Sequence, residues 1–261
     1  MTLKSELGSQ YVVFFILINV ERMLGFGRKL PARVAGSMLR LGRKYVIACL
    51  ENEVLRRLHH DFPTTLAEWD SSEDRQIEDG SELVTVFEVI SIAHEFRLFT
   101  ILPAVYAKYV ELLPLVASFC HNNAVVSDYY FEQERLPRNP GIPEKARECC
   151  ILGYVRILEY LKKTNTDALC PPLILPSQTC SRRGKCEANT IQKLPVWDTG
   201  ESERFGIFGR WGMRGPHVTK GLCARCQVQV KKLTNNVRSE FWLSLPTFFG
   251  LPAWADLKDE L

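Results

Sequence analysis

Four cysteines in the C-terminal half of the chain have a spacing that suits a zinc site. They form two pairs, Cys180-x5-Cys186 and Cys223-x2-Cys226. Four thiolates can surround zinc as a tetrahedron, and two pairs separated by a long loop are the usual way to supply them. The second spacing is standard, whereas the first is looser than usual. We therefore predict one structural zinc ion on these four residues; Cys170 and His217 are alternative ligands, and free thiols or a stray disulfide are the competing interpretation.

The expected role of this zinc is structural rather than catalytic. A catalytic zinc keeps an open position and usually has His or carboxylate ligands, and the chain has no HExxH run. The sequence also lacks a phosphate-binding loop and a GxGxxG motif, and its five histidines form no recognisable triad with Ser, Cys or carboxylates. We therefore expect a protein that is not an enzyme and has no small-molecule substrate.

The second cysteine pair opens a long amphipathic helix. From Leu222 onward, apolar residues recur in steps of three or four, at Leu222, Cys226, Val230, Leu233, Val237 and Phe241. This places both thiols on one side of the first turn, where the helix dipole favours thiolates. Pro246 is expected to end the helix.

Similar periodicity upstream predicts a mainly α fold. Two stripes, Val34–Tyr45 and Leu50–Leu58, indicate a helical hairpin that turns at residues 46–48 and ends at residues 61–63. Thr65 and Glu68 have the spacing of a capping box for a short helix. Further helices are expected over residues 83–94, over residues 102–113 with Thr100 as N-cap and Pro114 ending or kinking it, and over residues 146–161 after Pro143.

The expected organisation has four parts. Residues 1–33 form an atypical N-terminus with a possible strand at residues 11–20, a run too short to span a bilayer as a helix. Residues 34–70 form the helical hairpin, residues 81–164 a helical domain, and residues 165–261 an irregular cysteine-rich module with the long helix. Cys49, Cys120, Cys149 and Cys150 are predicted to be buried small hydrophobes, and His94 a core or boundary residue.

The charge is distributed unevenly. The chain carries +3 overall, yet the segment from Cys180 to Glu240 has twelve Lys and Arg against five Asp and Glu. A solvated basic face explains this most simply. Nucleic-acid binding is the alternative, because bases could stack on Phe205, Phe208 and Trp211, which lie among arginines.

Three segments together resemble BTB-domain proteins that are numerous in mushroom-forming fungi. The C-terminal signature of that family matches a CxxC pair, a tryptophan and a terminal LPxxFGL, here Cys223, Cys226, Trp242, Leu245, Pro246, Phe249, Gly250 and Leu251. The segment from Leu39 to Asp70 resembles the end of the BTB domain, and the segment from His94 to Leu112 resembles the helix that follows it.

This resemblance implies the end of a BTB domain followed by a BACK-like helical region. It also implies a non-enzymatic adaptor that binds proteins, either as a homo-oligomer or as a link to a cullin-type ubiquitin ligase. Only 33 residues precede Val34, fewer than the roughly one hundred of a typical domain. We therefore expect the BTB sheet to be largely missing and the family's domain-swapped dimer not to form.

The last four residues, Lys-Asp-Glu-Leu, are identical to a retention signal of the endoplasmic reticulum. They also fit a final helix, since Trp254, Leu257 and Leu261 have helical spacing. We predict that the match is coincidental and that the protein is cytoplasmic or nuclear, with no membrane partner; a lumenal protein is the alternative.

Overall fold

The computed structural model describes residues 29–72, 74–78, 82–121, 142–167, 176–193 and 221–260. Over these ranges the chain forms eight helices and no sheet, which confirms the predicted mainly α fold. The helices are α2 (Ala32–Tyr45), α3 (Ala48–Asp61), α4 (Leu66–Ser71), α5 (Glu82–Glu95), α6 (Leu102–His121), α8 (Glu144–Asp167), α10 (Arg183–Lys193) and α12 (Ala224–Phe248). None of the described helices combines the length and the apolar composition that a membrane crossing requires.

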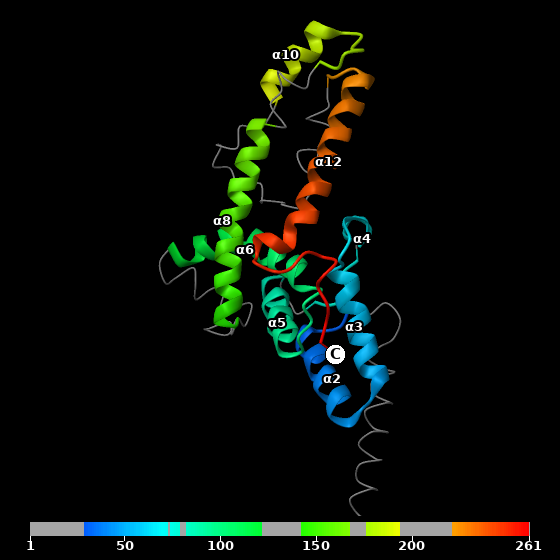
Figure 1. Cartoon of the computed structure of the whole chain (residues 1–261), viewed down its shortest axis with the longest axis vertical. Coiled ribbons are helices and arrows are strands. Elements are labelled where there is room, and N and C mark those ends of the chain that lie inside the picture. The colour runs from blue at the N-terminus through cyan, green and yellow to red at the C-terminus, as the bar shows by residue number, and fades with distance from the viewer. Residues whose placement is uncertain are drawn as a thin grey trace, which may run out of the picture.

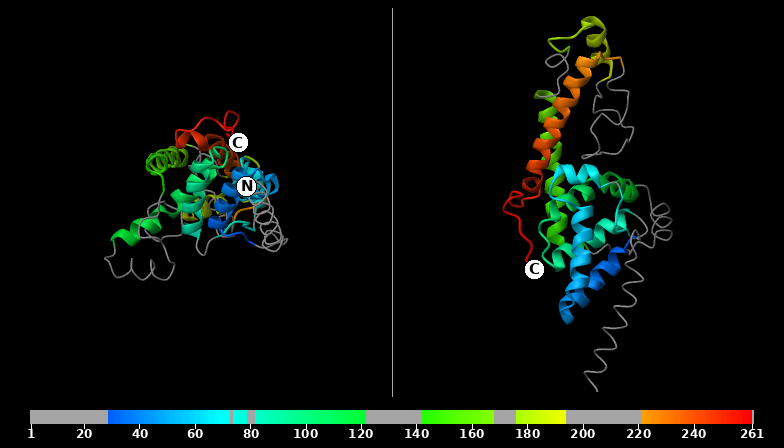
Figure 2. Two further views of the ribbon diagram at one scale, coloured as in Figure 1. Left: turned by 90° about the horizontal axis from the view of Figure 1, so that it is seen from below. Right: turned by 90° about the vertical axis from the view of Figure 1, so that its right-hand side faces the viewer.

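The helices form a body with an arm that projects from it (Figure 1). Helices α2 to α6 build the body, and the long helices α8 and α12 run side by side out of it, with α10 at the far end of the arm. Figure 2 shows the same projection from the side. The start of α12, which carries the cysteine pair, therefore lies far from the body.

The predicted helical hairpin is present as α2 and α3. The turn between them is made by Val46, which has a left-handed φ of 57°, and the N–H of Ile47 returns to the carbonyl of Gly42 at 2.8 Å. Thr65 is the N-cap of α4: the N–H of Glu68 donates to the hydroxyl of Thr65 at 3.3 Å, as in the predicted capping box, and that hydroxyl in turn donates to the Glu68 carboxylate at 2.6 Å. Local sequence rules therefore account for this part of the body.

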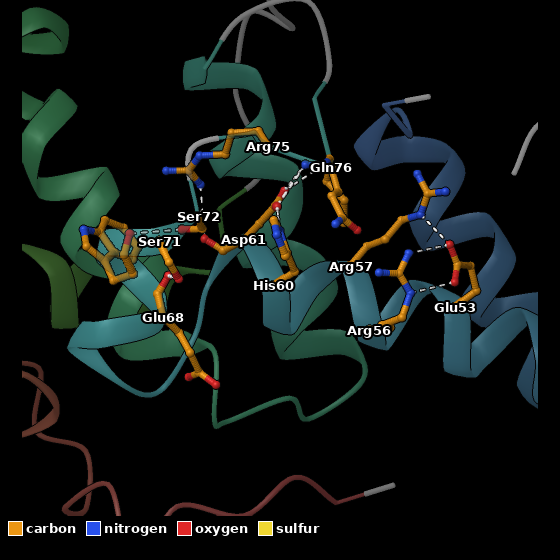
Figure 3. Close-up of polar contacts among 12 residues, drawn as sticks. Glu53, Arg56, Arg57, His60, Asp61, Glu68, Ser71, Ser72, Arg75 and Gln76 are labelled. Carbon is orange, nitrogen blue, oxygen red and sulfur yellow. Dashed lines mark hydrogen bonds and ion pairs between the residues drawn. The ribbon is translucent and has the colours of Figure 1, made fainter. Parts of the chain in front are cut away.

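Asp61, the last residue of α3, organises the loop that follows α4 (Figure 3). The residue is 2% exposed, and its carboxylate accepts hydrogen bonds from the N–H groups of Gln76, at 2.9 and 3.0 Å, and Ile77, at 2.7 Å. This holds Ile77 beside Leu30, where an isolated parallel bridge ties the start of the described chain to the body.

We expect Asp61→Asn to destabilise the protein by about 2 kcal/mol, since hydrogen bonds to buried charged groups are the stronger ones. Asparagine keeps the shape of the side chain but turns one acceptor into a donor that faces a backbone N–H. Urea unfolding should show a lower midpoint at an unchanged slope. Asp74→Asn, in the same loop, serves as a control with the same loss of charge; equal midpoints for the two variants would contradict the assigned role of Asp61.

Helices α5 and α6 form the centre of the core. Tyr106 is 1% exposed, its hydroxyl lies 2.6 Å from Nε2 of His94, and its ring contacts the ring of Phe249 edge-on, with centroids 5.3 Å apart. Burial lowers the pKa of His94 and raises that of Tyr106, so the hydroxyl donates to a neutral imidazole. The prediction that His94 is a core or boundary histidine agrees with this half-buried, hydrogen-bonded position.

Helix α6 differs from the prediction at both ends. Thr100 does not act as its N-cap, because the Thr100 hydroxyl donates instead to the carboxylate of Asp259. Pro114 does not end the helix, which continues to His121. The tertiary contact with Asp259 therefore overrides the local capping preference of Thr100.

The arm is an antiparallel pair of helices that carries its own aromatic contacts. The ring of Tyr160 on α8 contacts Phe241 and Phe248 of α12, with centroids 5.5 and 5.4 Å apart. Nη1 of Arg156 donates to the carbonyl of Phe248 at 3.0 Å, which satisfies one orphan carbonyl at the end of α12. These contacts hold the two helices of the arm together.

Three predictions about the C-terminal part need correction. Helix α12 continues for two residues past Pro246, and residues 254–260 form a turn and an extended segment instead of a helix. The stretch after Asn165 is not wholly irregular, since α8 reaches Asp167 and Arg183–Lys193 forms α10. The expected strand at residues 11–20, the aromatic run at residues 197–216 and nearly all of the proline-rich loop at residues 136–143 lie outside the described residues.

Candidate metal centre

The four predicted cysteine ligands meet at the end of the arm. Cys180 lies in a turn before α10, closed by its N–H bond to the carbonyl of Ser177 at 2.9 Å, and Cys186 lies in the first turn of α10. Cys223 is the N-cap of α12, and Cys226 lies in its first turn. Two helix starts therefore supply three of the thiols, and a tight turn supplies the fourth.

The spacing of the sulfur atoms fits a tetrahedral ion. All four lie within 4.8 Å of one another, and the Cys180 and Cys223 sulfurs are 3.6 Å apart. A tetrahedron with zinc–sulfur bonds of about 2.3 Å has sulfur–sulfur edges of about 3.8 Å. A disulfide requires about 2.05 Å, so the four cysteines are free thiols in this arrangement. The cluster therefore has the ligand set and dimensions of a closed zinc site, although the identity of an ion is a proposal.

Backbone N–H groups support the sulfurs from outside. The N–H of Arg182 lies 3.4 Å from the Cys180 sulfur, and the N–H of Cys223 lies 3.3 Å from the buried sulfur of Cys186. Hydrogen bonds of this kind favour the charged form of a thiol and orient it for a metal. They follow from the backbone conformation of the turn and the helix start, which residue spacing does not reveal.

The surroundings shift the pKa values of the thiols in opposite directions. The backbone N–H of Cys226 lowers the pKa of the Cys223 thiol to about 5, whereas burial raises the pKa of Cys186 and that of Cys226. Four thiolates this close would repel one another in a buried cluster. A divalent cation removes this conflict because a coordinating thiol is deprotonated outright.

Cationic side chains surround the cluster. Arg182, Arg183, Lys185 and Arg225 are exposed around it. Nη1 of Arg225 also donates to the carbonyl of Thr179 at 2.7 Å, which ties the first turn of α12 to the Cys180 turn. A zinc ion held by four thiolates would carry a net charge of −2, which these cations would balance.

The remaining cysteines divide into several environments. Cys150 is buried as predicted and Cys149 is half-buried, but Cys49 is exposed, which makes the prediction for Cys49 wrong. Cys49 lies at the start of α3 on the outer side of the hairpin turn. The alternative ligands Cys170 and His217, and the side chain of Cys120, lie outside the part that the structure describes.

Sequence reasoning missed a second polar cluster, on the body. His59, Thr100 and Asp259 come from α3, from the connection between α5 and α6, and from the C-terminal segment, and they bond to one another. Their separation along the chain left no local signal.

Comparison of the chain with protein-family models, with curated proteins and with solved structures finds no match.

Proposed function

We propose that this chain is a non-enzymatic protein-binding protein whose arm end is held by a structural zinc ion. The resemblance to fungal BTB adaptors supports this class of function. The observation that carries it is an exposed apolar face on α8, which we call the α8 patch: Ile151, Leu152 and Val155, about half exposed at 52%, 55% and 48%. Adjacent apolar side chains exposed on one helix face mark an interaction site more often than isolated ones do.

The charges around the α8 patch favour a second copy of the chain as its partner. Exposed Lys145 and Glu159 lie equally far from Leu152 along the helix, in opposite directions, and so do Glu148 and Arg156. At helical periodicity all four share the face of Leu152 and Val155. Two antiparallel copies of α8 crossing at Leu152 would place each lysine opposite a glutamate, as a two-fold symmetric contact requires. A homo-oligomer is therefore the first partner that we propose.

We expect Leu152→Glu to abolish self-association while changing the unfolding free energy of the monomer by less than about 0.5 kcal/mol. Like charges would meet at the two-fold axis. Sedimentation equilibrium over a range of concentrations measures the change, and Val228→Glu on α12, another exposed apolar position, is the matched control.

A charge swap sharpens this test. Lys145→Glu alone should weaken association, and Lys145→Glu combined with Glu159→Lys should restore it. A wild-type chain that stays monomeric at its highest soluble concentration would reject the homo-oligomer. Capture of a cullin-type ligase subunit that depends on Leu152 would then identify the partner implied by the resemblance.

Nucleic-acid binding is a second candidate because the end of the arm is cationic. The described exposed charges there are mostly positive: Arg182, Arg183, Lys185, Arg225, Lys231 and Lys232, against Glu187. Affinity for DNA or RNA should fall steeply with salt if these side chains bind phosphates. Absence of binding at low salt would remove this candidate.

A role in the lumen of the endoplasmic reticulum has less support than protein binding or nucleic-acid binding. The carboxylates of Asp259 and Glu260, inside the KDEL sequence, already bond to Thr100 and Arg97. A receptor could read these residues only after they leave the body. We therefore keep the cytoplasm or the nucleus as the proposed location.

A further inference from the structure

The segment after α12 returns along the body to the connection between α5 and α6. It runs from Leu251 to Glu260, drawn in red in Figures 1 and 2, and we call it the strap. Leu257 is 8% exposed, and the indole of Trp254 stacks on Trp242 with centroids 5.6 Å apart and an angle of 11° between the rings. The strap therefore packs on the molecule along its length.

The first attachment of the strap supplies a hydrogen-bond donor that Pro246 cannot provide within α12. The N–H of residue 246 would normally bond to the carbonyl of Trp242, four residues earlier, but proline has no N–H. The indole Nε1–H of Trp254 donates to that carbonyl at 2.7 Å. Pro246 and Trp254 thus form a matched pair, in which the strap supplies the donor that the helix lacks.

Its second attachment is a carboxylate site on the body. The carboxylate of Asp259 accepts from the N–H of Thr100 at 2.8 Å and from the Thr100 hydroxyl at 2.8 and 2.9 Å. His59 lies beside it, with Nε2 3.3 Å from the carboxylate. The side chain of Asp259 is only 9% exposed, so these donors replace most of the water around a charged group.

The tautomer of His59 makes this site sensitive to protonation. Its Nδ1 lies 2.8 Å from the carbonyl of Leu55, which can only accept, so Nδ1 carries a hydrogen. Nε2 therefore donates to Asp259 only when the ring is protonated. The other nearby charges are engaged elsewhere: His60 with Asp61, and Arg97 with Glu260.

We propose that residues 251–260 form a releasable strap that fixes the base of the arm to the body, and that Asp259 latches it in a carboxylate site built by Thr100 and His59. The two attachments lie at opposite ends of the strap. One engages the last turns of α12, and the other engages the connection between helices of the body. Loss of the latch frees the end of the strap, and the arm then depends on the remaining contacts of α12.

The latch is expected to be strongest in mild acid. The bond to Asp259 raises the pKa of His59 above 6.5, so the His59 contribution is complete below about pH 6.5 and is lost as pH rises through the folded pKa. The bonds from His59 and Thr100 lower the pKa of Asp259, against its burial, so its contribution is complete above about pH 3.8 and is lost as pH falls through the lower folded value. The window between these limits is where both charges are present.

The test compares Asp259→Asn with Asp256→Asn in the full chain. Asp256 is an exposed residue of the same strap, so its variant makes the same change of charge without touching the latch. Hydrogen exchange at pH 6 should become at least tenfold faster in the strap and at residues 97–101 for Asp259→Asn, and should stay as in the wild type for Asp256→Asn. Circular dichroism verifies that both variants are folded.

A second readout addresses the latch itself. The His59 ring, assigned by NMR with a His59→Gln variant, should titrate above its ordinary pKa in the wild type and return towards it in Asp259→Asn. Equal exchange in the two variants, or a His59 titration that does not depend on Asp259, would overturn the proposal.

Discussion

Protein purified without a chelator is expected to contain about one equivalent of zinc, and Cys226→Ser is expected to abolish it. Cys226 is fully buried and supplies one of the four sulfur atoms of the cluster, and the described residues offer no further cysteine or histidine among the grouped ligands. Serine is a poor zinc ligand, and its hydroxyl would be buried among thiols. Structural zinc contributes about 10 kcal/mol or more to the folding of small modules, which makes this the largest effect that we expect from a single substitution.

The loss of ordered structure that follows removal of the zinc should be confined to the end of the arm. Helix α10 has a polar sequence, and without the metal it has the small cluster of Cys186, Leu222, Cys223 and Cys226 to hold it. This is too little burial to offset its conformational entropy. Exchange should therefore rise in α10 and in the first turns of α12, whereas Trp242, which stacks on Trp254 and contacts the tilted ring of Trp69 at the other end of α12, should keep its fluorescence.

Cys49→Ser is the matched control, since Cys49 is an exposed thiol outside the cluster. That variant should retain the metal. Elemental analysis and thiol titration measure the outcome. Less than a tenth of an equivalent of zinc, with Cys180, Cys186, Cys223 and Cys226 reactive in the folded chain, would mean that these cysteines are ordinary residues.

Local signals predicted the parts of this fold that local chemistry determines. The α2–α3 hairpin, the N-cap at Thr65 and the start of α12 at Cys223 all follow from periodicity and caps within a few residues. The four cysteines could be grouped because two cysteine pairs separated by a long loop are the usual way to supply four zinc ligands. The sequence predicted which four cysteines lie together, but it did not predict which backbone N–H groups donate to their sulfur atoms.

The errors at Thr100, Pro246 and α10 share a physical cause, which is contact with side chains outside the element itself. Pro246 is tolerated inside α12 because Trp254 supplies the missing donor, and Thr100 leaves its capping role because Asp259 offers a stronger acceptor. Helix α10 has little apolar periodicity and is anchored through its cysteines. Trp254 lies beyond the end of α12, and Asp259 and Cys223 lie far along the chain from Thr100 and Cys186, so propensity alone favoured a break, a cap and a loop.

Gly153→Ala should destabilise the chain by about 2 kcal/mol, although alanine normally favours a helix by up to about 1 kcal/mol over glycine. A Cβ at residue 153 would lie 2.2 and 2.3 Å from two ring carbons of Phe249. That ring is 2% exposed and is held edge-on by Tyr106, whose hydroxyl is bonded to His94. The ring can move only by disturbing the body core, and overpacking of this kind costs about 1–3 kcal/mol.

Gly184→Ala is a control that should leave the stability of the chain unchanged or raise it, because nothing lies within 4 Å of a Cβ at that position of α10. Urea unfolding should therefore show a lower midpoint for Gly153→Ala and an equal or higher one for Gly184→Ala. Phe249→Ala, which removes the ring atoms that clash, should cost less when combined with Gly153→Ala than the sum of the two changes predicts. If Gly153→Ala were neutral or stabilising, α8 would not pack on Phe249 at this distance, and the close joint between arm and body at Gly153 would be wrong.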